Sequence, residues 1–444
     1  MKIAQRIEAQ ADEIISVLAE LIACPSVYAE DSEKYEFGAE IDKCLRKTLE
    51  IFRDFGFKTF YGAGQYGYAE IGSGKEMLGI LCHLDVVPAG SEADWESPPF
   101  KLTKRNGKLY GRGTIDDKGP LIAVLYAVKN LIDQGVYFNK RIRFIFGLDE
   151  ETLWRSIEQY LVNEEKPTFA FAPDSNFPLI NAEKALLQFK LVSENSSEIN
   201  LAGGTAFNVV PNEISYQSDD PDKLIRELDK LKANYQFDNN LITVFGKSAH
   251  ASKPYNGKNA IAVMLKALDN IYSDIESINF FNDYLGEDYK GLKIFGDLAD
   301  KESGPLTINL GKIKLDQTKQ ELFFDIRIPV TIKKEEIVNK LQEKIKSYGL
   351  KYIEHDYLDS LYIKEDDFLV QTLLKVFTDV TGQEAAPLSS GGATYSRAIE
   401  NCVAFGSVFP GEEKVEHQTN EYLKLDSLFK CIEIYAKAIY RLTR

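Results

Sequence analysis

The segment RIRFIFGL (141–148) constrains the fold most strongly, because it predicts a continuous apolar strand that leads directly into Asp149, Glu150 and Glu151. A strand of this kind is buried on both faces, as in a parallel sheet covered by helices. The almost wholly apolar helix predicted from Pro120 to about Ile132 is suited to cover such a sheet. Ligands gather at the carboxyl ends of parallel strands, so the acidic residues that follow this strand are candidates for a functional site.

The rest of the chain divides into two patterns. Helices are expected over residues 1–23 and 41–55, and strands over residues 57–61, 68–71 and 77–86. From about Ala185, alternating segments predict half-exposed strands among polar helices, which is typical of an α+β domain with a solvent-facing sheet. The α/β pattern then returns. We predict an α/β domain made of residues 1–184 and 359–444, with an inserted α+β lid domain over 185–358.

Composition and charge exclude several classes of protein. The 444 residues include 53 basic and 68 acidic side chains, and the net charge of −15 argues against nucleic acid as the main partner. We find no apolar stretch long enough to span a membrane, and the charged N-terminal segment is unlike a signal peptide. The five scattered cysteines form no C-x-x-C pair, which favours reduced thiols. We therefore expect a cytoplasmic protein without a nucleic-acid or membrane partner.

Two glycine-rich segments match nucleotide-binding motifs only in part. The segment GAGQYG (62–67) has the G-x-G-x-x-G spacing, but the residues after it predict a strand and a turn instead of a helix. The segment GSGK (72–75) lacks both the first glycine and the final Ser or Thr of a phosphate-binding loop. We interpret the first segment as a tight hairpin and reject both as phosphate sites.

Histidine is the most informative residue type, because three of the four histidines fall in motifs. His83 is followed two residues later by Asp85, at the end of an apolar strand. In an extended segment these side chains point to the same side, so Asp85 can accept a hydrogen bond from one imidazole nitrogen and leave the other for a metal. The other segments with chemical potential contain Asp116-Asp117 after GRG, the acids at 149–151, Asp174 in APD and His417 in HQTNE.

Each of these segments also has an ordinary explanation. His83 could be a core histidine satisfied by an aspartate, Asp116-Asp117 could be a solvated turn, and the acids at 149–151 could complement a helix dipole. Asp174 could be a turn residue and His417 a histidine of a surface loop. Two buried carboxylates side by side would repel each other and would need a cation. The order and spacing of the five segments together favour a metal site.

In this order, the motifs HLD, GRGTIDDKG, DEET, APD and a distant HQTNE resemble those of the M20 family of di-metal peptidases and deacylases. The resemblance is closest to the PepV-like branch of bacterial dipeptidases and covers nearly the whole chain. It implies a phosphorylase/hydrolase-like α/β catalytic domain with a central mixed sheet, together with the lid domain. It also implies a metallo-dipeptidase, an exopeptidase whose partner is a small dipeptide substrate.

The resemblance implies two divalent metal ions per chain. Asp116 would bridge the two metals, His83 and Asp174 would complete one site, and Glu151 and His417 would complete the other. The Asp116–Asp117 peptide bond is cis in this family. One imidazole and one private carboxylate for each ion form a donor set suited to zinc, with manganese or cobalt as alternatives.

The resemblance also assigns the catalytic residues. Hydroxide held between the metals would attack the peptide carbonyl, with Glu150 as its general base and later as the proton donor to the leaving amine. Asp85 would orient His83. In the lid, His250 of GKSAHAS would donate to the developing oxyanion.

Four further lid and loop residues would bind the substrate: Asn208, Arg327, Gly391 and Gly392. Arg327 suits a terminal carboxylate, and the glycines would allow the substrate to approach the backbone. Without the resemblance, Asn208 would be a turn residue and Arg327 an arginine on a strand face.

Other functions stay open at this point. Deacylation of an N-succinyl or N-acetyl amino acid would use the same ligands, since the metals and the base contact only the scissile amide. A non-catalytic binding protein would have no use for Glu150 and five intact ligands. The enlarged lid favours a monomer, with a dimer as the alternative. Leu153 replaces a glycine found in many relatives, and we expect this change to affect local packing.

Overall fold

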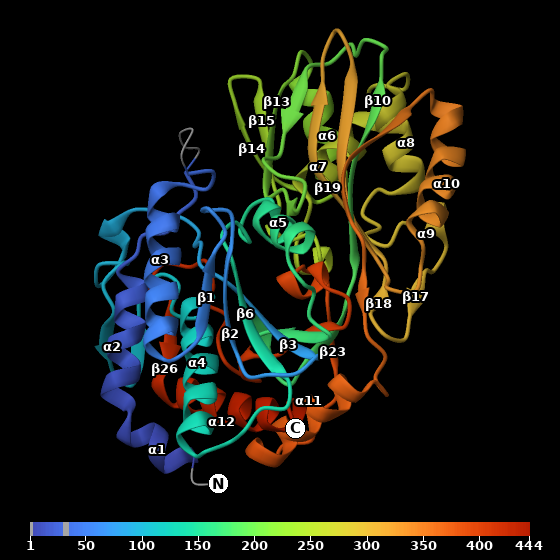
Figure 1. Cartoon of the computed structure of the whole chain (residues 1–444). Coiled ribbons are helices and arrows are strands. Elements are labelled where there is room, and N and C mark those ends of the chain that lie inside the picture. The colour runs from blue at the N-terminus through green and yellow to red at the C-terminus, as the bar shows by residue number, and fades with distance from the viewer. Residues whose placement is uncertain (1–2, 30–34) are drawn as a thin grey trace. The chain divides into compact units, whose positions relative to one another are not determined.

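The computed structural model describes residues 3–29 and 35–444, which divide into two compact units (Figure 1). The first unit comprises Met1–Asn181, Ile363–Leu388 and Ala393–Arg444. The second unit comprises Ala182–Tyr362 and Ser389–Gly392. The chain therefore leaves the first unit, forms the second, and returns to complete the first.

The first unit is built on a mixed sheet in the order β1-β2-β6-β3-β7-β24-β9. The strands are β1 (Lys58–Tyr61), β2 (Gly67–Ile71), β3 (Met77–His83), β6 (Arg141–Gly147), β7 (Phe169–Ala172), β9 (Ile180–Glu183) and β24 (Cys402–Ala404). β3 is parallel to β6 and β7, and β24 is parallel to β7, whereas β1, β2 and β9 pair antiparallel. The predicted mixed α/β architecture is confirmed.

Helices cover this sheet, and the residues of each helix that are buried are mostly apolar. They are α1 (Ile3–Ala9), α2 (Ala11–Ile22), α3 (Ala39–Asp54), α4 (Lys118–Asp133), α5 (Arg155–Asn163), α11 (Phe368–Thr381) and α12 (Leu425–Leu442), with short 3₁₀ helices at Glu92–Asp94 and Tyr395–Ala398. α4 packs against α2 and α12 and is buried along nearly its whole length, which explains why it lacks a polar face. The single helix expected over residues 1–23 is instead two helices that meet at Gln10.

Smaller strands complete the first unit. They are β4 (Thr103–Arg105), β5 (Lys108–Tyr110) and β26 (Tyr422–Lys424), which form one sheet, and the parallel pair β8 (Ser175–Asn176) and β25 (Ser407–Val408). The glycine-rich segment 62–67 forms the turn between β1 and β2, where the Gly62 N–H donates to the Tyr66 carbonyl at 2.9 Å. The interpretation of this segment as a hairpin is confirmed.

The second unit contains a five-stranded antiparallel sheet, β11-β19-β20-β10-β21, and a three-stranded sheet, β13-β15-β14. The strands are β10 (Ala185–Ser193), β11 (Leu201–Gly203), β13 (Glu213–Gln217), β14 (Asn234–Asp238), β15 (Leu241–Phe245), β19 (Thr307–Leu315), β20 (Gln320–Ile328) and β21 (Lys351–Leu358). The shorter strands are β12 (Val209–Val210), β16 (Ala249–His250), β17 (Ala299–Asp300), β18 (Gly304–Pro305), β22 (Leu361–Tyr362) and β23 (Leu388–Ser390). The helices are α6 (Pro221–Lys230), α7 (Ala260–Asp269), α8 (Glu276–Tyr284), α9 (Leu292–Phe295) and α10 (Lys334–Ile345), with 3₁₀ helices at Pro254–Asn256 and Lys346–Tyr348.

The expectation of half-exposed strands holds for β13, whose residues alternate between exposed and buried, but it is wrong for β20. Every residue of β20 is buried, because the strand lies between β19 and β10 and its polar side is covered as well. The buried charges of Asp325 and Arg327 neutralise each other across 2.6 Å. Alternation therefore predicted which residues share a face, but it did not predict that the polar face is buried.

Two further observations concern the described residues. Among residues 3–29 and 35–444, we find no helix that combines the length and the apolar character needed to cross a bilayer. All five cysteines are free thiols, and Cys24 alone among them is not fully buried.

Candidate metal centre

The predicted metal ligands come from the carboxyl ends of parallel strands and from two loops. His83 is the last residue of β3, Glu151 follows β6, and Asp174 follows β7. Parallel strands end at the same edge of a sheet, so the fold brings these residues together. Asp116 lies just before α4, and His417 lies in the loop before β26.

Asp116 is at the centre of this cluster, with a histidine against each of its carboxylate oxygens. His83 Nε2 lies 2.8 Å from Oδ1, and His417 Nε2 lies 3.0 Å from Oδ2. His417 Nε2 is also 2.9 Å from Glu151 Oε1, and His83 Nε2 is 3.8 Å from Asp174 Oδ2. Candidate ligand atoms of His83, Asp116 and Glu151 all lie within 4.8 Å of one another. The structure thus brings all five predicted ligands into one cluster.

The orientation of His83 is set by the backbone. Its Nδ1 lies 2.9 Å from the carbonyl oxygen of Asp85. A carbonyl can only accept, so Nδ1 carries a proton and Nε2 is the nitrogen that could bind a metal once it has lost its own proton. The expectation that the Asp85 carboxylate would hold the ring needs correction, because its Oδ1 is 3.5 Å from Nδ1, too far for a good hydrogen bond.

The carboxylate of Asp85 instead holds the two glutamates that follow β6. Oδ1 accepts from the Glu150 N–H at 3.1 Å, and Oδ2 accepts from the Glu151 N–H at 3.0 Å. Asp85 is itself fully buried, at 1% exposure. One aspartate therefore fixes His83 through its carbonyl and the glutamate turn through its side chain.

Replacing Asp85 by alanine is expected to lower the free energy of unfolding by about 1–3 kcal/mol, because two partly buried amides would lose their acceptor. Urea denaturation of the metal-free protein measures this change. Asp85→Asn keeps one acceptor oxygen and is expected to recover about half of the loss. Equal stability of Asp85→Ala and the wild type would contradict this role.

The three acids after β6 have different environments. Asp149 is structural: its carboxylate accepts from the backbone N–H groups of Arg155 at 3.0 Å and Ser156 at 2.9 Å, at the start of α5. This is the helix-terminal role that the sequence left open. In contrast, the carboxylate of Glu150 makes no hydrogen bond within residues 3–29 and 35–444, although its carbonyl accepts from Trp154 Nε1 at 2.8 Å. Glu150 is therefore fixed through its backbone and available through its side chain.

Burial and charge shape the electrostatics of the cluster. Burial acts to raise the pKa of Asp116, but hydrogen bonds from the two imidazoles outweigh it and hold this pKa below its usual range. Burial and the charge of Asp116 raise the pKa of Asp174 to about 8, and burial raises the pKa of Glu150 well above its usual range. Hydrogen bonds to Asp116 and Glu151 raise the pKa of His417 to about 11. The close carboxylates of the cluster therefore favour the binding of positive charge, either as protons or as metal cations.

These residues fit a pair of divalent cations. Two imidazole nitrogens and three carboxylates form the donor set that zinc, cobalt or manganese prefers. The bond from His83 Nδ1 to a carbonyl is the outer contact that metal-binding histidines usually make. Lys118, two residues after Asp116, donates to the carbonyls of Leu21 at 3.0 Å and Cys24 at 2.9 Å and not to the cluster. The Asp116–Asp117 peptide bond is cis, as the family resemblance implied.

In the second unit, His250 is exposed at the end of β16. Its Nδ1 accepts from the Ser252 N–H at 3.2 Å and lies 2.8 Å from Ser252 Oγ. A backbone amide can only donate, so the ring proton is on Nε2. Although the residue is exposed, neighbouring protein atoms desolvate part of the ring, and this desolvation and the charge of Arg327 lower the pKa of His250, which keeps the ring neutral at neutral pH. The ring can therefore act as a neutral hydrogen-bond donor.

Arg327 is already paired within its own unit. Its Nε and Nη2 donate to the Asp325 carboxylate at 2.6 and 3.0 Å, and its Nη1 donates to the Gly391 carbonyl at 2.7 Å. The fork expected to bind a substrate carboxylate is thus occupied by Asp325 in this conformation. The second hydrogens of Nη1 and Nη2 remain for another partner.

The other predicted substrate residues lie on loops of the second unit. The carbonyl of Asn208 accepts from the Ala251 N–H at 2.9 Å. The Gly392 N–H donates to Ser390 Oγ at 3.0 Å. A Cβ at Gly391 would lie 2.7 Å from the Cβ of Ser252, so only glycine fits there.

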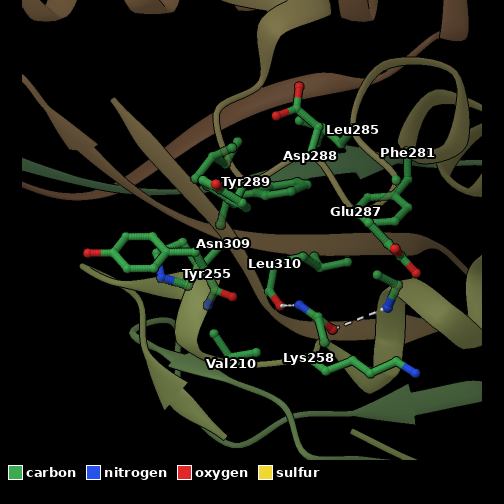
Figure 2. A pocket seen from close by; sticks show the side chains of 17 residues that line it. Val210, Tyr255, Lys258, Phe281, Leu285, Glu287, Asp288, Tyr289, Asn309 and Leu310 are labelled. Carbon is green, nitrogen blue, oxygen red and sulfur yellow. Dashed lines mark hydrogen bonds between the residues drawn. The ribbon is translucent and has the colours of Figure 1, made fainter. Parts of the chain in front are cut away.

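The second unit also contains a separate cavity of about 210 Å³ (Figure 2). Its wall combines apolar side chains such as Val210 and Leu310 with polar ones such as Lys258, and the rings of Tyr255 and Tyr289, which also line it, are 5.7 Å apart. None of the predicted substrate residues lines this cavity. It is therefore distinct from the site that the sequence motifs indicate.

Sequence reasoning missed two residues and misjudged a third. Arg112 and Glu421 stand inside motifs that pointed to the metal site, but no role was assigned to either. They form a buried ion pair at 2.7 Å, and their opposite charges inside two such motifs were the signal that could have revealed it. Leu153 was expected to affect local packing, but its side chain is 69% exposed.

Comparison with known proteins finds similar chains and similar folds. The family model described as Peptidase family M20/M25/M40 matches residues 79–441. The Bacillus subtilis (strain 168) protein YtjP, provisionally named a dipeptidase, is 35% identical over 433 residues, which is 92% of each chain. The structure of aminopeptidase PepT from Bacillus cereus has a TM-score of 0.62 at 16% identity and covers 98% of this chain and 99% of that chain. The di-peptidase Dug1p from Saccharomyces cerevisiae has a TM-score of 0.60 at 15% identity and covers 99% and 98%. The two structural likenesses show the fold.

Proposed function

Because the chain belongs to peptidase family M20/M25/M40, we propose that it is a metal-dependent dipeptidase that hydrolyses the single peptide bond of dipeptides. One observation carries the proposal: Asp116 has an imidazole nitrogen within 3.0 Å of each carboxylate oxygen, with Glu151 and Asp174 beside them. The dipeptidase name of the Bacillus subtilis relative and the description of Dug1p as a di-peptidase support a dipeptide substrate. The proposal includes action as a monomer, as the resemblance implies, and a location in the cytoplasm, as composition and charge led us to expect.

The proposed metal ligands divide between two ions. His83 and Asp174 would hold one ion, Glu151 and His417 would hold the other, and Asp116 would be shared. Zinc is the proposed metal, and manganese or cobalt would also suit these donors. When bound, the ions supply Lewis-acid activation of the peptide carbonyl and of a water molecule.

Glu150 is the proposed general base. Its N–H is held by Asp85 and its carbonyl by Trp154, while its carboxylate is not engaged within the described part of the chain. Such a carboxylate is positioned yet able to exchange a proton. It accepts a proton from the attacking water and passes it to the nitrogen of the leaving amine.

Residues of the second unit are proposed to contact the substrate. His250 would donate from Nε2 to the oxyanion that develops on the carbonyl oxygen. Asn208, Gly391 and Gly392 would contact the substrate through their loops. Arg327 would use the Nη hydrogens that Asp325 and Gly391 leave, which suits a carboxylate at the end of a dipeptide.

A substrate panel tests this proposal directly. The protein is loaded with zinc or manganese and assayed on dipeptides, on tripeptides, and on N-acetyl and N-succinyl amino acids with the same C-terminal residue. We expect kcat/KM for dipeptides to exceed the others by about a hundredfold or more. A site that pairs both charged ends of a dipeptide rejects N-acyl amino acids, which lack the ammonium group, and tripeptides, whose charged ends lie farther apart. Faster turnover of N-succinyl or N-acetyl substrates would identify a deacylase instead. Absence of both metal binding and amide hydrolysis would leave a binding protein.

A further inference from the structure

Two loops of the first unit start from the same small sheet. β5 pairs with β26, and beyond this pairing the Gly111 N–H donates to the carbonyl of Glu421 at 3.0 Å. One loop then runs forward from Gly111 to Asp116, and the other connects Glu421 back to His417. Two of the proposed metal ligands, Asp116 and His417, are therefore carried by loops that both begin at the pairing of β5 with β26.

The buried carboxylate of Glu421 is bonded along the loop that carries Asp116. Its Oε2 accepts from the Gly113 N–H at 3.1 Å, and its Oε1 accepts from the Ile115 N–H at 2.9 Å. Ile115 immediately precedes Asp116. The bond to Ile115 therefore fixes the residue next to the proposed shared ligand.

Arg112 extends these contacts to two other segments. Its Nη1 donates to Glu421 Oε2 at 2.7 Å, while its Nη2 reaches the carbonyl of Pro88 at 3.3 Å and that of His417 at 3.5 Å. Pro88 belongs to the segment that follows β3. The side chains of Arg112 and Glu421 are only 2% and 1% exposed, so the pair is shielded from solvent. One ion pair thus contacts the two loops that carry Asp116 and His417 and also the segment that follows His83.

We propose that Arg112 and Glu421 are positioning residues of the metal centre, whose ion pair holds Asp116 and His417 at the separation that two divalent cations require. This inference rests on the proposed function, because it concerns the ligands assigned there. Neither side chain belongs to the ligand cluster itself. Both act through the backbone of the two loops.

The surroundings of the ion pair explain why its loss is expected to displace the proposed ligands. Burial and the charge of Asp116 raise the pKa of Glu421 to about 7, against the opposing effect of two backbone amides and Arg112. Removing one partner would leave the other charge buried and unpaired. The loop is also tightly packed, since a Cβ at Gly119 would lie 2.0 Å from the Thr114 carbonyl oxygen. This contact prevents the loop of residues 111–116 from moving toward α4. If the ion pair were lost, we therefore expect the loop to move in another direction and to shift Asp116.

The test compares Glu421→Gln with a matched variant in the full chain. Glutamine keeps the size of the side chain but removes its charge and one acceptor oxygen. We expect the affinity for Zn²⁺, measured by competition with a chelator, to fall by about 10–100-fold. The visible absorption bands of the Co²⁺-loaded protein are expected to change, since they report the geometry of the ligands.

Glu70→Gln is the matched control. Glu70 forms an equally short ion pair with Arg143 at 2.6 Å, between β2 and β6 of the same unit. Its loss is expected to lower the free energy of unfolding while the Zn²⁺ affinity stays within about twofold of the wild type. If Glu421→Gln lowers stability but leaves the Zn²⁺ affinity and the Co²⁺ spectrum unchanged, the pair is merely structural and the inference is wrong.

Arg112→Lys gives a second measurement, which decides the matter if Glu421→Gln does not fold. Lysine keeps the positive charge beside Glu421 but cannot form the fork that reaches the carbonyls of Pro88 and His417. We expect a smaller loss of Zn²⁺ affinity, about 3–10-fold. Affinity equal to the wild type would overturn the inference.

Failure of the proposed function would look different. A wild-type protein that binds no Zn²⁺ would overturn both the proposed function and this inference. A wild type that binds Zn²⁺ but cleaves only N-acyl amino acids would overturn the dipeptidase proposal, and the loss of affinity in Glu421→Gln would still support the positioning role. Failure of the inference alone leaves the wild type active and the variant equal to it in metal binding.

Discussion

Asp116→Asn is expected to abolish detectable dipeptide hydrolysis and to reduce the bound metal from about two ions per chain to about one or fewer. The reason is that Asp116 has a histidine against each oxygen, at 2.8 and 3.0 Å. Asparagine offers one neutral oxygen and an amide group that cannot bind a cation. Metal content after dialysis, measured by mass spectrometry, and steady-state turnover check this result.

Two controls accompany this prediction. Asp366→Asn changes an exposed aspartate of the same unit and is expected to leave metal content and turnover unchanged. Chelation is expected to lower the stability of the wild type by about 3–4 kcal/mol for each bound ion at metal concentrations of 100–1,000 times Kd, because a metal that binds only the folded state stabilises it. Asp116→Asn should lose less on chelation. A variant that keeps two ions and full turnover would exclude Asp116 as the shared ligand.

The parallel core of the first unit could be predicted from the sequence because burial and composition coincide there. Nearly every residue of β3 and β6 is buried, so both strands consist largely of apolar residues. The same reasoning failed at β20, where Asp325 and Arg327 are polar and yet buried. Their charges neutralise each other two residues apart, and the sequence pattern cannot distinguish such a pair from two solvent-exposed residues.

The candidate ligands could be predicted because few residue types bind divalent metals and histidine is scarce in this chain. The contacts that orient them could not. Asp85 lies two residues after His83, and the spacing is compatible with a bond to its carboxylate or to its carbonyl. In the structure the carbonyl is the closer acceptor, at 2.9 Å from Nδ1 against 3.5 Å for the carboxylate, whose oxygens accept from the amides of Glu150 and Glu151. Every residue has a backbone carbonyl, so a sequence does not indicate which carbonyl accepts a given hydrogen bond.

The pair of Arg112 and Glu421 shows the same limit over a longer range. The two residues are 309 positions apart, and each is an ordinary charged residue by composition. Their meeting depends on the pairing of β5 with β26, which are both strands of three residues. Such short strands give almost no periodic signal. The clustering of the proposed ligands was therefore predictable, but the buried ion pair that contacts their loops was not.

Glu150→Gln is expected to lower kcat for dipeptide hydrolysis by about 10²–10⁴-fold, with metal content and folding unchanged. Glutamine has nearly the same shape but cannot take up a proton from water at neutral pH. The bonds that fix Glu150 involve its N–H and its carbonyl, so the substitution leaves them in place. Steady-state kinetics, metal analysis and circular dichroism of the same preparations measure the three quantities.

Glu158→Gln is the matched control, because Glu158 is an exposed glutamate on the adjacent helix α5. It is expected to keep the wild-type kcat. A loss of kcat in Glu150→Gln with KM changed by less than about threefold assigns the effect to the transition state and not to substrate binding. A Glu150→Gln protein with the wild-type kcat would place the general base on another residue, whereas a protein that has lost its metal would show that Glu150 supports the neighbouring ligand Glu151. Only an intact metal content with a lower kcat supports proton transfer by Glu150.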